Sequence, residues 1–136
     1  MQRYETKILL AFGEAVSGNK KLFRWLAENN YVELAALSNC INSDTKAFYW
    51  LLKNGYPEFA ILSNAMDGYD DAYIWLKKNN YMFYIVFADA CRNQPKAQEW
   101  LKKNKLDVFL HLAQIIYDVL EKQRRDSYDY HKIRFN

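Results

Sequence analysis

The sequence predicts an all-α fold, a right-handed α-α superhelix (solenoid) of about four tandem helix–turn–helix repeats with a capping helix at each end. Three observations predict this fold. Rare residues recur at a fixed spacing, apolar residues inside each unit lie at helical spacing, and the chain has only four glycines and two prolines. Few special turns are therefore possible, which favours short helical connections over β-hairpins.

A tryptophan column defines the repeat, with members 25 residues apart at Trp25, Trp50, Trp75 and Trp100. A leucine follows each tryptophan. An asparagine column stands three residues after each leucine, at Asn29, Asn54, Asn79 and Asn104. Further columns of aromatic, apolar and small residues align on the same spacing. A period in this range is typical of stacked supersecondary units, so it predicts a solenoid built from 25-residue units.

Each repeat contains two apolar stripes, each on one face of an amphipathic helix. Ala47, Trp50 and Leu51 lie at i, i+3 and i+4, and Phe59 and Leu62 begin the second stripe. Turn residues separate the stripes, because the tryptophan helices are preceded by accepted N-cap residues and followed by the asparagine column, which suits a left-handed helix end. We predict nine helices, over about 4–17, 20–28, 31–42, 45–53, 56–67, 70–78, 81–92, 95–103 and 106–124.

The last predicted helix is longer than the others, because nothing interrupts LDVFLHLAQIIYDVLEKQRR. We interpret it as a terminal cap that shields the open end of the solenoid. Residues 126–136 carry no periodicity. The predicted organisation is therefore one solenoid domain over residues 1–125 and a C-terminal tail over 126–136.

Composition narrows the functional classes. Hydrophobic residues make up 51% of the chain, which excludes a disordered protein, and the net charge of +3 permits an anionic partner without requiring one. No long apolar run follows the N-terminus, so we expect neither a signal peptide nor a membrane span. Two cysteines are too few for a disulfide framework. We therefore expect a cytoplasmic protein that does not bind membranes.

Residues 59–79, FAILSNAMDGYDDAYIWLKKN, resemble the helical part of an ankyrin repeat. They contain two short helices, a glycine between them and a Trp-Leu pair near the end. Ankyrin units run about 33 residues and carry a β-hairpin, whereas this unit is about what remains without that hairpin. The family's Thr-Pro-Leu-His opening is absent. The resemblance is to short α-hairpin solenoids in general, and it implies a binding role.

The two most regular columns each allow two interpretations. The tryptophan column could stack on bases or sugars, but its place on the apolar stripe favours packing between successive hairpins. The asparagine column could bind a peptide backbone, but its place at a helix end favours C-capping or a hydrogen bond between repeats. We expect the four tryptophans to be buried at equivalent sites and the asparagines to have the capping role.

No set of residues predicts catalysis. Cys40 and Cys91 align with alanine, isoleucine and methionine, so we interpret them as small core residues. His111 and His131 are isolated, without an acid or cysteine at a suitable interval. Acidic residues gather at Asp67, Asp70 and Asp71, where a helix N-terminus explains them better than a cation or an acid–base pair. We predict no catalytic residue, no metal and no cofactor, and therefore no enzyme.

A column of lysines could form a ridge that binds anions. Lys53, Lys78 and Lys103 share one position of the repeat, and another lysine column lies two helical turns upstream. If the hairpins stack, these rows lie side by side and could meet nucleic-acid phosphate. The alternative is a solvated face with lysines at helix C-termini, and acidic interruptions in the ridge favour it.

The helix predicted over residues 81–92 is apolar on all sides. Met82, Phe83 and Val86 stand where an amphipathic helix would place polar residues. They predict a partner-binding surface in a groove lined by the second helix of each unit. The alternative is that the tail covers them through Tyr128, Tyr130 and Phe135. We therefore predict a protein–protein interaction module, an adaptor or a self-associating subunit, with nucleic-acid binding through the lysine ridge as the alternative.

Overall fold

The computed structural model describes the backbone of residues 1–135 and the side chains of residues 1–127. Within this part of the chain there are nine α-helices and no strand, as predicted. The helices are α1 (Thr6–Val16), α2 (Lys20–Glu28), α3 (Val32–Ile41), α4 (Thr45–Lys53), α5 (Pro57–Met66), α6 (Asp70–Lys78), α7 (Met82–Cys91), α8 (Pro95–Lys103) and α9 (Asp107–Phe135).

The asparagine column caps the helices that carry tryptophan. The side-chain amide of each member donates a hydrogen bond of 2.7–2.8 Å to the carbonyl of the tryptophan four residues earlier. The next residue is left-handed in every case, with φ between 56° and 86° at Asn30, Gly55, Asn80 and Lys105. The N–H after it donates to the buried leucine carbonyl, as from Tyr56 to Leu51 at 2.9 Å. The predicted C-capping role is confirmed, with the left-handed residue one position later than expected.

The N-caps predicted for the tryptophan helices are one residue too early, as the turns before these helices show. Gly18, Ser43, Gly68 and Asn93 have positive φ and end the preceding helix. The N-cap is the residue after each of them. At Asn19 and at Asp44 the side chain accepts hydrogen bonds from backbone N–H groups of the first helical turn.

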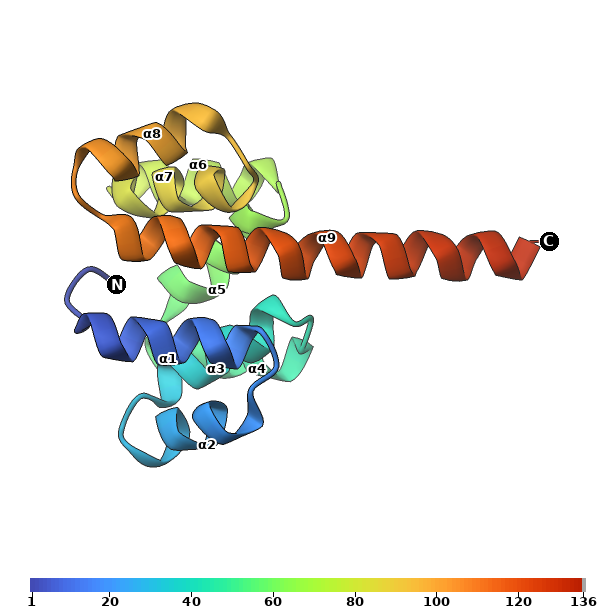
Figure 1. The fold of residues 1–136 in the computed structure, drawn as a ribbon, viewed down its shortest axis with the longest axis horizontal. Helices are drawn as coiled ribbons and strands as arrows, with labels where there is room; N and C mark the ends of the chain where they lie inside the picture. The colour runs from blue at the N-terminus through green and yellow to red at the C-terminus, as the bar shows by residue number, and fades with distance from the viewer. Residues whose placement is uncertain (136) are drawn as a thin grey trace.

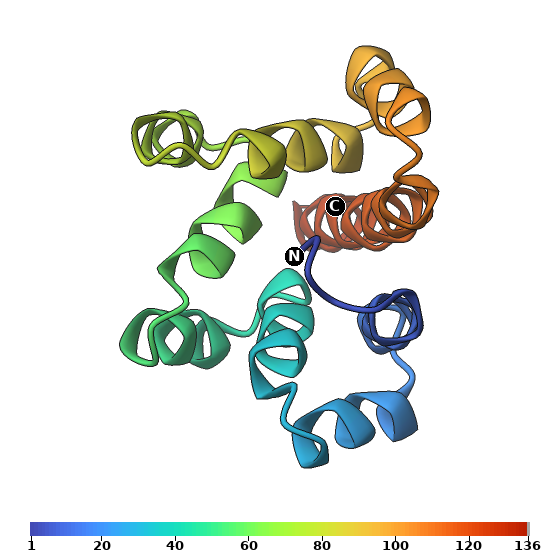
Figure 2. The same ribbon diagram turned by 90° about the vertical axis from the view of Figure 1, so that its left-hand side faces the viewer.

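The odd-numbered helices form a closed inner ring. α1, α3, α5, α7 and α9 pack on one another in that order, and α9 also packs on α1. We call these the inner helices and α2, α4, α6 and α8 the outer helices. Each outer helix packs on the two inner helices that flank it in the chain. Figure 2 looks along α9 and shows the inner helices around a common centre, with the outer helices outside them.

Gly13 lies where the ring closes. A Cβ atom at Gly13 would lie 2.8 Å from Leu112 Cδ2 and 3.2 Å from Ile115 Cδ1, so a side chain here requires the ends of these two α9 side chains to move. Gly13 belongs to a column of small, buried residues on the inner helices, with Ser38, Ser63, Ala88 and Ala113. The sequence predicts that the last helix shields the open end of a solenoid. In the structure α9 packs on both α1 and α7, so its first half completes the ring.

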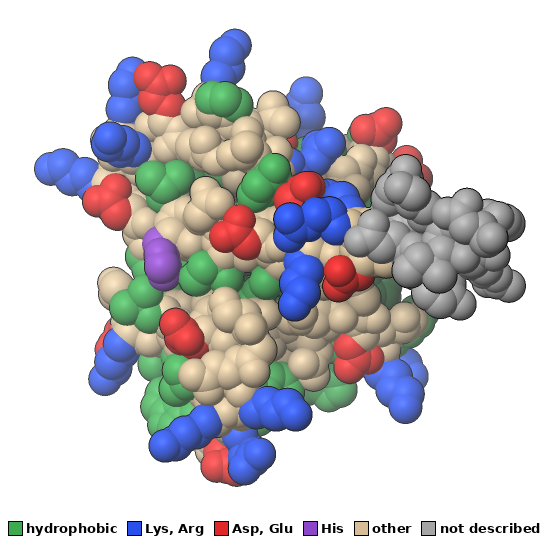
Figure 3. Space-filling model, turned by 45° about the vertical axis from the view of Figure 1, so that its right-hand side comes forward, with side chains coloured by type: hydrophobic (Ala, Val, Ile, Leu, Met, Phe, Trp, Pro, Cys, Tyr) green, Lys and Arg blue, Asp and Glu red, His purple; other side chains and the backbone are tan. Residues whose placement is uncertain are grey.

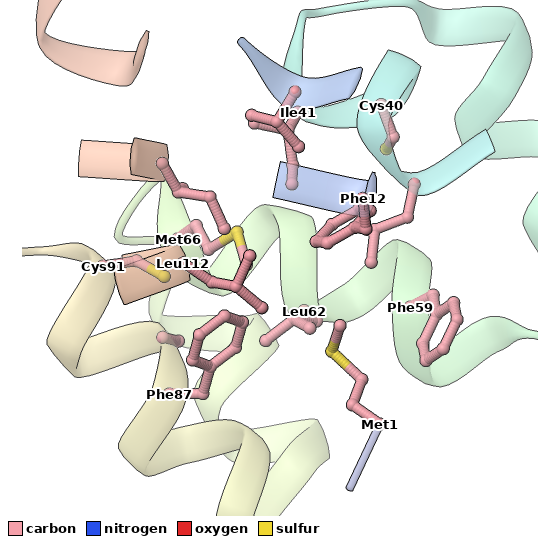
Figure 4. Packing of buried hydrophobic residues seen from close by; sticks show 14 of the residues in the cluster. Met1, Phe12, Cys40, Ile41, Phe59, Leu62, Met66, Phe87, Cys91 and Leu112 are labelled. Atoms are coloured by element: carbon pink, nitrogen blue, oxygen red, sulfur yellow. The ribbon is translucent and has the colours of Figure 1, made fainter. Parts of the chain in front are cut away.

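The core fills the centre of the ring (Figure 4). The phenylalanines Phe12, Phe59, Phe87 and Phe109 come from four inner helices and are almost completely buried. The cysteines, Cys40 on α3 and Cys91 on α7, are also buried and free, as their alignment predicted. Burial raises the pKa of both thiols, which disfavours the reactive thiolate.

The prediction that the tryptophans are buried is wrong. Trp25 is 39% exposed and Trp100 is 42% exposed, while the leucine after each tryptophan is fully buried. The first three tryptophans stack on the tyrosine six residues later, with ring centroids 6.1, 6.4 and 5.7 Å apart. Outer helices pack on one side only, so one residue of the Trp-Leu pair enters the core and the other covers the turn.

Truncating a tryptophan should therefore have a modest effect. Trp50→Ala removes a half-buried ring and its stacking on Tyr56, so we expect a loss of about 1–2 kcal/mol of unfolding free energy. Urea denaturation measures this change. Trp50→Phe keeps an aromatic ring over Tyr56 and should retain most of the stability. A loss for Trp50→Ala as large as that of a core truncation would contradict the half-buried placement.

The last helix does not end where the tail was predicted to begin. α9 is helical to Phe135, so residue 126 is not a helix boundary, and the helix projects beyond the ring (Figure 1). The tail side chains Tyr128, Tyr130 and Phe135, the alternative cover for α7, lie outside the described side chains. Across the described residues no helix is both long and apolar enough to span a bilayer.

Candidate functional site: the outer grooves

Grooves run between neighbouring outer helices. Each outer helix packs on inner helices and makes at most marginal contact with another outer helix in the described structure. The outer helices are therefore spread apart around the ring. Around α3, the outward face of the inner helix is left as a floor between α2 and α4. The floor residues belong to four columns of the repeat, represented on α3 by Val32, Ala35, Ala36 and Asn39 and on α9 by Asp107, Leu110, His111 and Gln114.

One outer groove lies over α3, beside α2. It consists of two neighbouring cavities that share Phe23 and Asn39: one of about 450 Å³ is lined by α1, α2 and α3, and one of about 270 Å³, which has a mostly apolar lining, by α2, α3 and α4. Volumes of this size are typical of ligand-binding pockets. We call this the α3 groove, and define it by its lining residues Ala15, Gly18, Asn19, Lys20, Phe23, Arg24, Ala27, Val32, Ala35, Ala36, Asn39, Asn42, Asp44, Lys46, Ala47 and Trp50.

Small side chains form part of the floor of this groove. Ala36 occupies a column that holds Ile61, Val86 and His111 in the later repeats. Ala27 occupies a second column, which holds Leu52 and then Lys77 and Lys102. Both columns have their smallest member at the α3 groove, where the two alanines line the cavity of about 270 Å³.

The rim of the α3 groove is basic. Lys20, Arg24 and Lys46 are exposed, and none of them forms an ion pair within the described residues. Asp44 is the acidic residue of the lining, and its Oδ1 accepts from the backbone N–H groups of Lys46 at 2.9 Å and Ala47 at 3.4 Å. Three cationic side chains stand against this one carboxylate, so the rim presents a net positive charge.

Asn39 places an amide on the floor. Its side chain is half-buried and forms no hydrogen bond with the described residues. Its column is polar in every repeat, with Asn64, Asp89 and Gln114. Sequence reasoning missed this column, although a polar position recurring on otherwise apolar helices is visible in the alignment. An amide can donate and accept at once, so it can pair with one peptide unit of a ligand.

The predicted partner-binding residues are divided between two faces of α7. Met82 is 55% exposed, and Val86 is half-buried in the column of Ala36. Phe83 packs inward on α9, with its ring 4.9 Å from that of Phe109 and also stacked on Phe87. Neighbouring inner helices therefore explain part of the apolar character of α7, and Met82 and Val86 remain on the outward face.

The lysines of the predicted ridge lie on three different outer helices. Lys53, Lys78 and Lys103 are exposed in the last turns of α4, α6 and α8. Within the described residues these helices make at most marginal contact with one another. On the face that Figure 3 shows, basic side chains stand both at the edges and near the middle, and acidic side chains lie among them.

The other ionisable candidates do not converge. Asp70 and Asp71 lie in the first turn of α6, as the dipole interpretation requires, and Asp67 is the C-cap of α5. His111 is exposed in a groove between α8 and α9. His131 lies outside the described side chains. Among the residues that the structure describes, no group of three potential metal ligands comes together.

Half-buried tyrosines link inner helices to neighbouring segments. The Tyr4 hydroxyl donates to Glu33 Oε2 at 2.7 Å, which holds the N-terminal segment against α3. The Tyr73 hydroxyl donates to Asp89 Oδ1 at 2.8 Å and links α6 to α7. Burial raises the pKa of Tyr4 and Tyr84, and burial together with the Asp89 carboxylate raises the pKa of Tyr73 to about 12. Sequence reasoning did not identify these tyrosines.

Stability should therefore fall at alkaline pH. An unfolded tyrosine ionises near pH 10, whereas Tyr73 in the fold keeps its proton to about pH 12. The raised folded pKa contributes stability that is present below about pH 10 and is lost as the pH rises through about 12. Thermal denaturation at increasing pH, with tyrosinate absorbance, checks this. The Tyr73→Phe variant should lose less stability than the wild type between about pH 10 and pH 12. A wild-type stability that does not change over this interval would contradict the half-buried placement of Tyr73.

Comparison of the chain with protein-family models, with curated proteins and with solved structures finds no significant match.

Proposed function

We propose that this protein is a protein–protein interaction module, an adaptor or an oligomer-forming subunit, and not an enzyme. The observation that carries the proposal is the α3 groove, a hollow apolar floor with basic residues at its rim. We further propose that the ring is a solenoid of four 25-residue repeats whose curvature is tight enough to bring its ends together. A cytoplasmic setting is part of the proposal and is compatible with two free, buried cysteines.

A folded scaffold with grooves between repeated helices suits binding, because side chains that line a groove can vary without disturbing the core. Self-association is the form of the proposal that Met82 and Val86 favour, since they place apolar surface on the outward face of α7. Nucleic-acid binding through Lys53, Lys78 and Lys103 is the weaker alternative, because these lysines are on separated helices.

Affinity capture tests the proposal. The immobilised full chain is incubated with nuclease-treated native lysate, captured proteins are identified, and each is titrated in purified form against the chain, while light scattering reports self-association. We expect a purified protein to bind, or the chain to form a defined oligomer that Met82→Glu dissociates. A chain that stays monomeric, captures no protein and instead binds RNA until Lys53, Lys78 and Lys103 are changed to glutamate would overturn it.

A further inference from the structure

We infer that the α3 groove binds an extended peptide segment in which acidic residues flank apolar ones. This inference rests on the proposed function and adds the chemistry of the ligand. It is carried by three features of the groove: a hollow apolar floor, a basic rim without intramolecular ion pairs, and an amide on the floor without a hydrogen-bonding partner among the described residues.

The floor selects apolar side chains. Phe23, Ala27, Val32 and Ala36 form a continuous apolar surface between α2 and α4, and Trp50 closes one side. Val32 is 40% exposed, so a ligand side chain placed on it would remove apolar surface from water. Because Ala27 and Ala36 leave the cavity open, the ligand side chain enters without a rearrangement of the core.

The rim selects acidic side chains. Lys20 and Arg24 border the groove on α2, and Lys46 borders it on α4. The positions of Lys20 and Arg24 are threonine and tyrosine in the second repeat, then aspartate and isoleucine in the third. The basic character of α2 along the groove is therefore particular to this repeat. Carboxylates on both sides of an apolar residue would meet these cations.

Asn39 favours an extended ligand over a helical one. Its amide can pair with both the N–H and the C=O of a ligand peptide unit. In an α-helix these groups are already bonded within the helix, whereas an extended segment leaves them free. The floor amide would therefore contribute to binding only for an extended segment.

Selection from a displayed library of random octapeptides, with the full chain as bait, tests the inference. The matched control is the variant Ala27→Leu with Ala36→Ile, which we call the filled variant. It introduces the residues that the second repeat carries at these positions, so the fold should tolerate it. We expect peptides with acidic residues around apolar ones to be enriched on the wild type and not on the filled variant. Enrichment of neutral or basic sequences, or equal enrichment on a filled variant with native circular dichroism and melting, would overturn the inference.

Affinities of a selected peptide then test each feature. Arg24→Glu with Lys46→Glu should weaken binding by about tenfold or more, and Asn39→Ala should weaken it by about threefold or more. The control Lys53→Glu changes an exposed lysine outside the groove and should leave the affinity within about twofold. A peptide that binds as a helix by circular dichroism, or is insensitive to the rim charges, contradicts the assignment. If a captured protein still binds the filled variant unchanged, the α3 groove assignment fails while the proposed function stands.

Discussion

Phe87→Ala is expected to destabilise the protein by about 3–5 kcal/mol, the range typical of truncating a buried aromatic ring. Phe87 is completely buried, and its ring packs on Phe83 and, at a centroid distance of 5.6 Å, on Phe109 of α9. Its truncation would leave a cavity where α7 meets α9, and the closed ring limits how far the neighbouring helices can relax into it. Urea denaturation monitored by circular dichroism measures the change.

Met82→Ala is the matched control on the same helix. Met82 is 55% exposed, so its truncation should change the unfolding free energy by no more than about 0.5 kcal/mol. Equal losses for Phe87→Ala and Met82→Ala would mean that the inward and outward faces of α7 are not as assigned. The comparison therefore also tests whether Met82 is free to contact a partner.

Gly13→Leu is expected to destabilise the protein by about 3 kcal/mol, because a side chain at this position overlaps Leu112 and Ile115 of α9. The strain acts where the ring closes, so we expect α1 to separate from α9. Hydrogen exchange should show increased opening of α1, and urea denaturation should show the loss of stability.

Glu14→Leu is the control, since it adds the same side chain to the next residue of α1 at an exposed position. It should have little effect, apart from added surface hydrophobicity. Gly13→Ala is a milder test, because the atom it meets is the flexible end of Leu112 and alanine favours helix. Equal stability of Gly13→Leu and the wild type would show that the contact between α1 and α9 does not hold the ring together.

The helices could be predicted from the sequence because their determinants are local. The apolar stripes and the capping asparagines involve residues within one or two turns of each other, and the 25-residue spacing repeats this local pattern along the chain. The burial of Cys40 and Cys91 followed from alignment with apolar residues. The half-burial of Trp50 did not follow from alignment. Two adjacent residues on one apolar stripe can differ in burial when a helix is covered on a single side.

The closure of the ring could not be predicted in this way. The pattern that predicts stacked hairpins holds for any curvature, and closure depends on how far each hairpin rotates relative to the last. That rotation results from packing at columns such as Gly13 and Ser38, and its consequence is a contact between residues almost a hundred positions apart, Gly13 and Leu112.

The same distinction applies to the candidate site. The sequence identified Met82, Phe83 and Val86 as an unusually apolar set, because periodicity reveals where polar residues are missing. It did not show that Phe83 turns toward Phe109 while Met82 faces outward. Nor did it identify the α3 groove, since its lining comes from α1, α2, α3 and α4, which only the fold brings together. Spacing along the chain determines the helices and their apolar faces, and the packing of distant helices decides which faces stay open to a partner.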